Sequence, residues 1–129
     1  MIGKIVSMDF DGVIHSYKSG WCGADVIPDP PNPGAMEFIL AALQHGLEIH
    51  IHSSRCATEE GCVAILHYMR KHAQEHFGFL PREFENIVIS PDKPPAHVSI
   101  DDRAICFKGI WPTIKEIMEF QPWFKTATA

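Results

Sequence analysis

The sequence opens with a short apolar segment that leads directly into two aspartates: Lys4-Ile5-Val6-Ser7-Met8-Asp9-Phe10-Asp11-Gly12-Val13. The β-forming residues of this segment predict a buried strand, and the polar cluster behind it predicts a loop. Functional sites of open parallel sheets lie beyond the carboxyl ends of the strands. We therefore expect the chemistry of this chain to begin at Asp9.

Strands and helices alternate along the rest of the chain. Residues 15–33 contain Gly20, Gly23 and four prolines, which predicts an irregular flap. Helical spacing of apolar residues, strand-like alternation and capping residues predict the elements that follow. These are a helix begun by Asn32 with Pro33 in its first turn and ended by Gly46, a strand over 47–52, a helix begun by Thr58 and ended near Gly78, strands over 86–90 and 97–100, and an amphipathic helix from Pro112 that carries Ile114, Ile117 and Met118.

This alternation predicts an α/β fold, specifically a Rossmann-like three-layer sandwich with a mainly parallel central sheet covered on both faces. The chain has 129 residues, and its length and 46% hydrophobic content fit one domain over residues 1–125 with a flexible tail over 126–129. No cap domain is expected, because only about 20 irregular residues follow Val13 and the segment between Ser54 and Asp92 accommodates just a helix, a loop and a strand.

Composition limits the functional classes. The net charge of −5 argues against sequence-blind binding to nucleic acid or to an anionic membrane, although a local basic groove stays compatible with it. The longest apolar runs fall short of the ~20 residues of a membrane span, and the N-terminus lacks the pattern of a signal peptide. We therefore expect a cytoplasmic protein. Its four cysteines lack metal-binding spacing and are expected to be reduced thiols.

Unusual polar residues follow four of the expected strands. Since the carboxyl ends of parallel strands meet at one edge of a sheet, these residues should converge. Carboxylates gathered in this way repel one another unless a cation neutralises them, and hard oxygen ligands favour Mg²⁺. The residues are Asp9 and Asp11 after the first strand, Ser53 after the second, Lys93 in a later loop, and Asp101 with Asp102 after the last.

In their order and setting these residues resemble the haloacid dehalogenase superfamily of phosphatases and phosphotransferases. The first motif of that superfamily, an apolar strand followed by Asp-x-Asp-Gly-Val or Asp-x-Asp-Gly-Thr, matches residues 8–13. The second, a strand that ends in Ser or Thr, matches residues 50–53; the third is Lys93, and the fourth is Ile100-Asp101-Asp102. The resemblance spans residues 4–102 and implies a small phosphatase-type hydrolase without a cap.

The resemblance also implies a role for each residue of the first motif. Asp9 would be the nucleophile that attacks phosphorus and forms an aspartyl-phosphate. Asp11 would be the general acid for the leaving oxygen and then the base for the attacking water, aimed by a tight turn at Gly12.

The remaining motifs would stabilise charge. Lys93 and Mg²⁺ would offset the charge of the transferring phosphoryl group, while Ser53 and nearby backbone N–H groups hold its oxygens. The metal ligands implied by the resemblance are Asp9, the backbone carbonyl of Asp11, Asp101 and Asp102; which aspartate of the last pair coordinates directly stays open.

Residues beside the motifs are candidates for substrate binding. Gly12, Ser54 and Arg55 flank motif positions, and Arg55 could contact the substrate phosphate, although a surface ion pair explains it equally well. Trp21 in the flap could stack on a base or ring, and a core position is the alternative. An open site without a cap suits a phosphate on a large or extended molecule, or a site that a second subunit of a homo-oligomer covers.

The leading hypothesis is therefore Mg²⁺-dependent hydrolysis of phosphomonoesters. One alternative is a nucleotide or nucleic-acid end phosphatase, which the missing cap and Trp21 favour and the acidic net charge weakens. An alternative from another class is a non-catalytic binding or regulatory module that keeps the same fold. His72 and His76, four residues apart on an expected helix, could form a metal-binding face, but a solvated helix face explains them as well.

Overall fold

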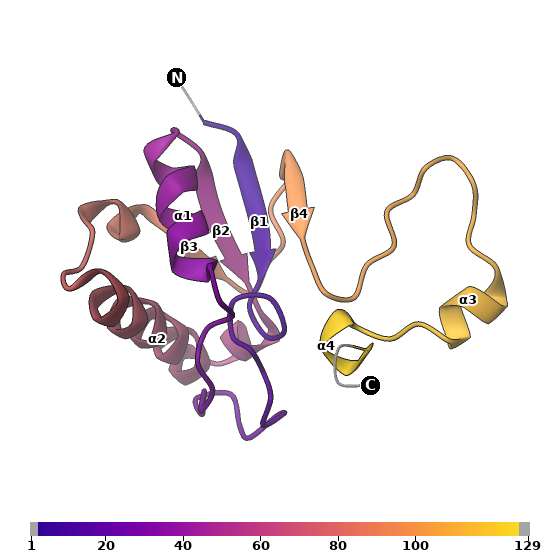
Figure 1. Ribbon diagram of the computed structural model, residues 1–129, viewed down its shortest axis with the longest axis horizontal. Helices are drawn as coiled ribbons and strands as arrows, with labels where there is room; N and C mark the ends of the chain where they lie inside the picture. The colour runs from indigo at the N-terminus through magenta and orange to yellow at the C-terminus, as the bar shows by residue number, and fades with distance from the viewer. Residues whose placement is uncertain (1–2, 127–129) are drawn as a thin grey trace.

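The computed structural model describes residues 3–126 and contains a four-stranded parallel sheet (Figure 1). Its strands are β1 (Ile5–Asp9), β2 (Glu48–His52), β3 (Val88–Ser90) and β4 (Val98–Ile100), in the spatial order β3-β2-β1-β4. Neighbouring strands pair in parallel throughout. The expected α/β class with a parallel sheet is confirmed, and the expected strands begin one to two residues later than the sequence pattern indicated.

The register of the strands aligns their carboxyl ends. Asp9 pairs with His52 of β2, and Met8 pairs with Ile100 of β4. Asp101 therefore leaves the sheet immediately beside the end of β1. This register is what brings two distant polar segments of the sequence to one place.

Two longer helices, α1 (Ala35–Gln44) and α2 (Glu59–Phe77), cover one face of the sheet. Side chains alternate between the two faces of a strand. Accordingly, one set from β1 and β2 joins the helices in a single buried core, whose members include Val6, Met8, Ile49, Ile51, Ile39 and Ile65.

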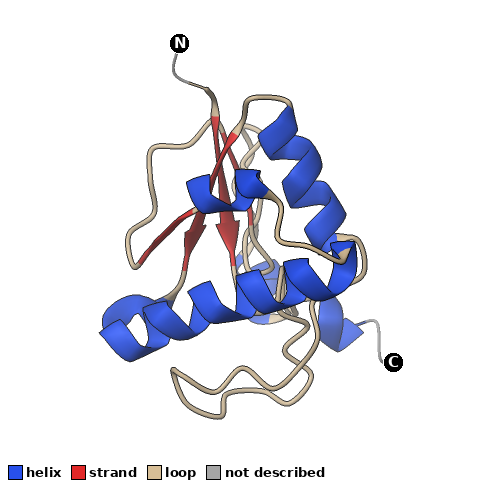
Figure 2. Ribbon diagram, turned by 90° about the vertical axis from the view of Figure 1, so that its left-hand side faces the viewer, coloured by secondary structure: helices blue, strands red, loops and turns tan. Residues whose placement is uncertain are grey.

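The opposite face of the central strands is polar. Ser7 is fully buried there, and its Oγ lies 3.0 Å from Nδ1 of His52 on the neighbouring strand. Figure 2 shows that the loop joining β3 to β4, residues 91–97, passes on the side of the sheet opposite α1. We expected helices on both faces of the sheet and a loop containing Lys93 between these two strands. The loop is present as expected, and within residues 3–126 it takes the place of a covering helix on this face, because seven residues that include two adjacent prolines cannot form a helix.

Local hydrogen bonds explain where the helices begin and end. Thr58 caps α2 as expected, accepting the Gly61 N–H at 3.1 Å, and Gly78 ends that helix with a φ of 80°. Asn32 does not cap α1, whose N-cap is Gly34. The Asn32 side chain instead donates to the Val13 carbonyl at 2.8 Å and thereby ties the flap to the loop after β1.

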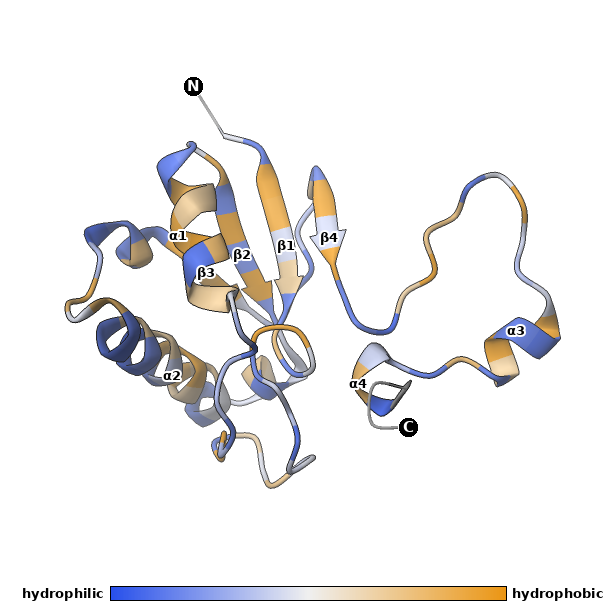
Figure 3. Cartoon of the chain, in the orientation of Figure 1, coloured by the Kyte–Doolittle hydropathy of each residue, from blue (hydrophilic) through white to orange (hydrophobic). Residues whose placement is uncertain are grey.

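The C-terminal part of the described chain departs most from expectation. The helix expected from Pro112 is a short α3 (Ile114–Met118), followed by α4 (Trp123–Thr126). Ile114 and Met118 are 75% and 79% exposed, so the expected buried face is not formed. Figure 3 shows apolar residues along the extended segment between β4 and α3 as well. Residues 127–129 of the expected tail lie outside the described residues.

The remaining elements are two short 3₁₀ helices, η1 (Ser54–Ala57) and η2 (Arg82–Asn86). The flap over residues 15–33 contains neither helix nor strand, as expected, and is linked to its surroundings by isolated bridges such as His15 with Pro31. Among the described residues, no helix combines the length and apolar character needed to cross a membrane.

Candidate functional site

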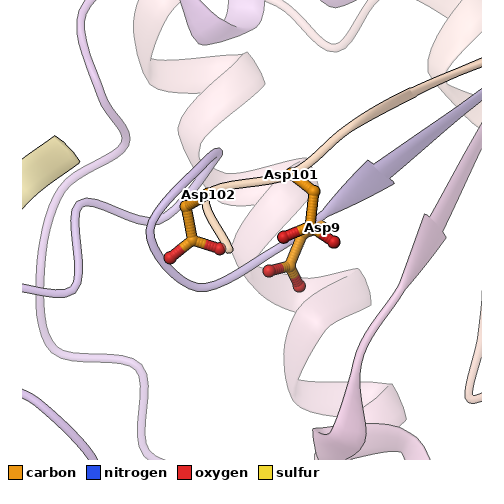
Figure 4. A group of neighbouring side chains, drawn as sticks. All are labelled: Asp9, Asp101 and Asp102. Atoms are coloured by element: carbon orange, nitrogen blue, oxygen red, sulfur yellow. The ribbon is translucent and has the colours of Figure 1, made fainter. Parts of the chain in front are cut away.

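Three carboxylates meet at the carboxyl end of the central strands. One oxygen each from Asp9, Asp101 and Asp102 lies within 4.8 Å of the others. Figure 4 shows Asp9 at the end of β1 and the other two aspartates on the loop that follows β4. We call these three residues the acidic triad. The strand register described above accounts for their convergence.

The surroundings of Asp102 fit a bound cation. Its side chain is only 3% exposed, and its buried Oδ1 has no hydrogen-bond partner. A buried carboxylate oxygen without a partner is costly, and a hard divalent cation would satisfy it. Arg103 Nε, at 3.9 Å from Asp102 Oδ2, is too distant for a hydrogen bond. The acidic triad therefore offers the ligand chemistry that a hard divalent cation requires.

The same arrangement shifts the pKa of Asp9. Burial is the largest cause and, together with the adjacent carboxylates of Asp102 and Asp101, raises the pKa of Asp9 to about 8. The Phe10 N–H, which donates to Asp9 Oδ1 at 2.8 Å, opposes this shift in pKa and orients the carboxyl group. A nearby cation would favour the ionised form of Asp9.

Asp11 is not a member of the acidic triad and forms an ion pair with Arg55. Arg55 Nε lies 2.9 Å from Asp11 Oδ2, and Nη2 lies 3.0 Å from Oδ1. His15 Nδ1 lies 2.8 Å from the same Oδ1, while His15 Nε2 accepts the Asp29 N–H at 3.2 Å. Because Nε2 accepts, the neutral imidazole carries its proton on Nδ1 and donates it to Asp11.

These bonds hold Asp11 in its charged form. Burial alone would raise the pKa of Asp11, but the hydrogen bonds from His15 and Arg55 outweigh burial and keep the pKa below its usual value. In this conformation the carboxylate accepts protons poorly and has no proton to donate. The expected role of Asp11 as general acid would therefore require its side chain to turn away from Arg55.

Arg55 also fastens the flap to the body of the domain. Its side chain is fully buried, and Nη1 donates to the carbonyls of Gly23, Ala24 and Val26 at 2.7–3.2 Å. The ring of Trp21 covers the guanidinium at 4.8 Å. The expected contact between Arg55 and substrate phosphate would need these bonds to break. Trp21 itself is 55% exposed and lies outside the core.

The structure does not assign a role in the site to the other expected residues. Ser53 is buried at the end of β2, and its Oγ accepts the Arg55 N–H at 3.1 Å, so it caps η1. Ser54 and Lys93 are exposed, and Lys93 lies in the loop after the edge strand β3. The structure brings together Asp9, Asp101 and Asp102, whereas the roles of Ser53, Ser54 and Lys93 stay predictions.

Gly12 lies where the loop after β1 is most crowded. Its φ is 86°, and a Cβ added to it would overlap the Asp102 carboxylate and lie 2.9 Å from Phe124 Cε1. The indole N–H of Trp123 donates to the Gly12 carbonyl at 2.8 Å. Glycine is thus required at this position by both backbone conformation and space.

Sequence reasoning missed His15, Trp123 and Phe124. The spacing of His15, four residues after Asp11 in a glycine-containing turn, was a signal that the two side chains could meet. No local signal indicated that residues 123 and 124 would return to Gly12 from the far end of the chain. His72 and His76, by contrast, contact Glu75 and Glu37 singly and belong to no metal-binding group in residues 3–126.

Comparisons of this chain with protein-family models, with curated proteins and with solved structures gave no match. The functional assignment therefore depends on the arrangement of its own side chains. Within the described residues, the group with metal-binding geometry is the acidic triad.

Proposed function

We propose that this chain is a Mg²⁺-dependent phosphomonoester hydrolase in which Asp9 is the nucleophile. The observation that carries the proposal is the acidic triad at the end of the central strand, with the partnerless Asp102 oxygen inside it. The resemblance to haloacid dehalogenase phosphatases supports the same roles. The proposed enzyme has a Rossmann-like sandwich fold without a cap domain. Its proposed substrate is a phosphate carried on a large or extended molecule.

Asp9, Asp101 and Asp102 would hold the cation, together with the backbone carbonyl of Asp11. When bound, Mg²⁺ supplies positive charge that offsets the charge of the phosphoryl group. Asp9 Oδ1 is engaged by the Phe10 N–H, which leaves Oδ2 as the oxygen best available to attack.

In the first step an Asp9 oxygen bonds to phosphorus, and the bond between phosphorus and the leaving oxygen breaks. The leaving oxygen takes a proton from Asp11, which would first turn from Arg55 and take up that proton from solvent. Water then attacks phosphorus, its proton passes to Asp11, and inorganic phosphate and the Asp9 carboxylate are released. The ion pair with Arg55 would keep Asp11 away from the acidic triad between turnovers.

Release of phosphate from p-nitrophenyl phosphate tests this proposal, with Mg²⁺ or with excess EDTA. We expect turnover only with Mg²⁺, loss of turnover in Asp9→Asn, and turnover close to that of the parent in Asp25→Asn, an exposed aspartate of the flap. Circular dichroism would establish that the Asp9 variant is folded. Turnover by Asp9→Asn at the parent rate would reject Asp9 as the nucleophile.

The Asp11–Arg55 pair favours a second candidate function, a regulatory module that binds Mg²⁺ and phosphate without turnover. A permanently paired Asp11 could not protonate a leaving group. The two candidates differ in one measurement: the module would gain thermal stability from Mg²⁺ but release no phosphate from any phosphomonoester in a broad panel.

A further inference from the structure

An open pocket of about 660 Å³ lies beside the acidic triad. Its lining comes from the flap, from the loop after β4 and from α4, and consists of Ser16, Tyr17, Lys18, Gly20, Arg103, Phe124 and Lys125. We call it the Tyr17 pocket. Its volume lies within the usual ~300–1,000 Å³ of small-molecule sites.

Two residues that line the Tyr17 pocket, Arg103 and Phe124, also lie close to Asp102 or to Gly12. Arg103 follows Asp102 in the chain, and its Nε lies 3.9 Å from Asp102 Oδ2. Phe124 approaches Gly12 at the point where the Asp102 carboxylate also approaches it. Arg103 and Phe124 therefore connect the lining of the pocket with Asp102 and Gly12, so one ligand could reach both the pocket and the acidic triad.

The pocket is basic although the chain is acidic. Lys18, Arg103 and Lys125 line it, against a net charge of −5 for the whole sequence. Lys18 and Arg103 are exposed, and Arg103 Nε lies 3.9 Å from Asp102 Oδ2, beyond hydrogen-bond distance. The exposed cations of Lys18 and Arg103 at one opening suit an anionic group of the ligand, separate from the phosphate at Asp9.

The pocket also offers aromatic and hydroxyl groups. Tyr17 and Phe124 both line the pocket, and their rings form a T-shaped pair with centroids 6.3 Å apart and an interplanar angle of 85°. Ser16 is only 5% exposed, and its Oγ has no hydrogen-bond partner. A buried hydroxyl without a partner is unfavourable unless a ligand or water satisfies it, so Ser16 independently indicates a polar ligand.

We propose that the Tyr17 pocket binds the remainder of a nucleotide substrate, with a second phosphate group against Lys18 and Arg103 and the base against Tyr17 and Phe124. The proposal rests on the function proposed for Asp9 and narrows its substrate class to nucleosides that carry a second phosphate beside the scissile one. Two kinds of molecule offer a nucleoside with a second phosphate: a free nucleoside bisphosphate and the phosphorylated end of a nucleic-acid strand.

Substrate selectivity tests this pocket. The assay compares adenosine 3′,5′-bisphosphate, a single-stranded oligonucleotide with a terminal phosphate, and adenosine monophosphate at fixed ionic strength. We expect kcat/KM to be at least about tenfold higher for the substrates with a second phosphate, in keeping with a charge-assisted hydrogen bond. Preference for the bisphosphate or for the oligonucleotide identifies the source, and either preference supports the proposal. Equal kcat/KM for all three substrates would overturn it.

Variants then assign the preference to the pocket. Lys18→Ala and Arg103→Ala should each lower the ratio of bisphosphate to monophosphate kcat/KM by about tenfold, whereas the matched change Arg82→Ala on η2 should leave the ratio unchanged. An unchanged ratio in both pocket variants would contradict the proposal. Lys18→Ala is the cleaner variant, because Lys18 does not adjoin the acidic triad in the chain.

Direct binding separates this inference from the proposed function. Isothermal titration calorimetry with adenosine 3′,5′-bisphosphate requires no turnover. If the chain hydrolyses nothing but binds the bisphosphate, and Lys18→Ala weakens that binding by about tenfold, then the proposed function fails and the pocket stands. If the chain hydrolyses p-nitrophenyl phosphate but binds the bisphosphate no more tightly than inorganic phosphate, the pocket fails alone.

Discussion

Asp11 and Arg55, 44 residues apart in the sequence, form an ion pair through two nitrogens of the guanidinium, with Nε 2.9 Å from Oδ2 and Nη2 3.0 Å from Oδ1. The pair joins the loop after β1 to the 3₁₀ helix after β2. Since the same guanidinium also donates to flap carbonyls, it links the loop after β1, the flap and the 3₁₀ helix after β2 in one network.

Removing the Arg55 charge should destabilise the domain severely. Arg55→Met keeps much of the side-chain volume but removes the guanidinium donors from the flap carbonyls and from the Asp11 carboxylate, which keeps His15 as its partner. We expect the free energy of unfolding to fall by about 3–5 kcal/mol, the usual loss when one partner of a buried pair is removed. Urea denaturation measures the change. Arg70→Met on the exposed surface of α2 is the control and should change stability by less than ~0.5 kcal/mol. A loss below 1 kcal/mol in Arg55→Met, on the order of a surface pair, would show that the network is not stabilising.

Removal of one charge from the acidic triad should stabilise the protein without metal and reduce its stabilisation by Mg²⁺. Without a cation, burial together with the charges of Asp101 and Asp102 disfavours the ionised form of Asp9, whose pKa is raised to about 8, so Asp101→Asn should raise the melting temperature in EDTA. Mg²⁺ at 100 times its Kd should stabilise the parent by ~2.7 kcal/mol, and Asp101→Asn should lose most of that gain. Thermal unfolding with and without Mg²⁺ measures both effects.

Glu85→Gln, which removes an exposed carboxylate from η2, is the matched control and should keep the full response to Mg²⁺. If Asp101→Asn gains as much stability from Mg²⁺ as the parent does, the triad is not the metal site.

The sequence sufficed to predict the convergence of the acidic triad, because parallel strands bring their carboxyl ends to one edge whatever their separation in the chain. Asp101 was expected beside Asp9 for this reason, and the pairing of Met8 with Ile100 produces that proximity. The order of the strands in the sheet, and what covers the second face of the sheet, were not predictable from the periodicity of apolar residues. The residues between β3 and β4 were expected to form a proline-rich loop, and they do; that this loop leaves the second face of the sheet without a covering helix was not predicted from it.

The contacts of Arg55 and the placement of the C-terminal segment were also beyond sequence reasoning. A lone arginine after a strand has no local signal that distinguishes a buried network from a substrate contact. Apolar spacing in residues 114–118 predicted a helix correctly, but spacing cannot say what covers the apolar side. Long-range packing determines both the contacts of Arg55 and what covers the apolar side of residues 114–118, and a short window of sequence does not indicate such packing.

Gly12 should be far less tolerant of a side chain than other glycines with the same backbone conformation. Gly12 and Gly78 have φ angles of 86° and 80°, but only at Gly12 would an added Cβ meet other atoms, those of Asp102 and Phe124. Both Gly12→Ala and Gly78→Ala incur the cost of a left-handed residue, about 1–2 kcal/mol.

We expect Gly12→Ala to lose in addition most of its stabilisation by Mg²⁺, because the new methyl group displaces the Asp102 carboxylate. Gly78→Ala should keep that stabilisation. Thermal unfolding of the two variants with and without Mg²⁺ distinguishes backbone strain from steric displacement. The same Mg²⁺ response in both variants would mean that Asp102 tolerates the methyl group.

Cys56 should be unreactive in the folded protein. Burial, with a further contribution from the neighbouring Cys62 thiol, raises the pKa of Cys56 to about 12. At pH 8 only ~10⁻⁴ of this thiol is ionised, and the thiolate is the reactive form. Cys22 and Cys106 are exposed. We therefore expect a maleimide to label Cys22 and Cys106 in the native state and Cys56 only after unfolding, as located by peptide mass spectrometry. Labelling of Cys56 at the same rate with and without urea would show that it is not buried.

Self-association should follow from the exposed apolar side chains of residues 105–120. Ile110 and Trp111 are 84% and 80% exposed, and the other large apolar side chains of this segment are 38–79% exposed. Their combined exposed area is on the order of 1,000 Å², comparable with the ~800 Å² that each partner buries in a standard interface.

We expect the chain to form a dimer whose population rises with concentration, measurable by light scattering coupled to size-exclusion chromatography. Removing apolar area at the centre of the segment should weaken the dimer most, because each large side chain contributes about 1.5–3 kcal/mol when it is buried. Trp111→Ser combined with Ile110→Ser should therefore shift the equilibrium toward monomer. Val26→Ser, a comparable change in the exposed flap, should leave the equilibrium unchanged. A parent protein that stays monomeric at millimolar concentration would mean that these side chains do not mediate association between copies of the chain.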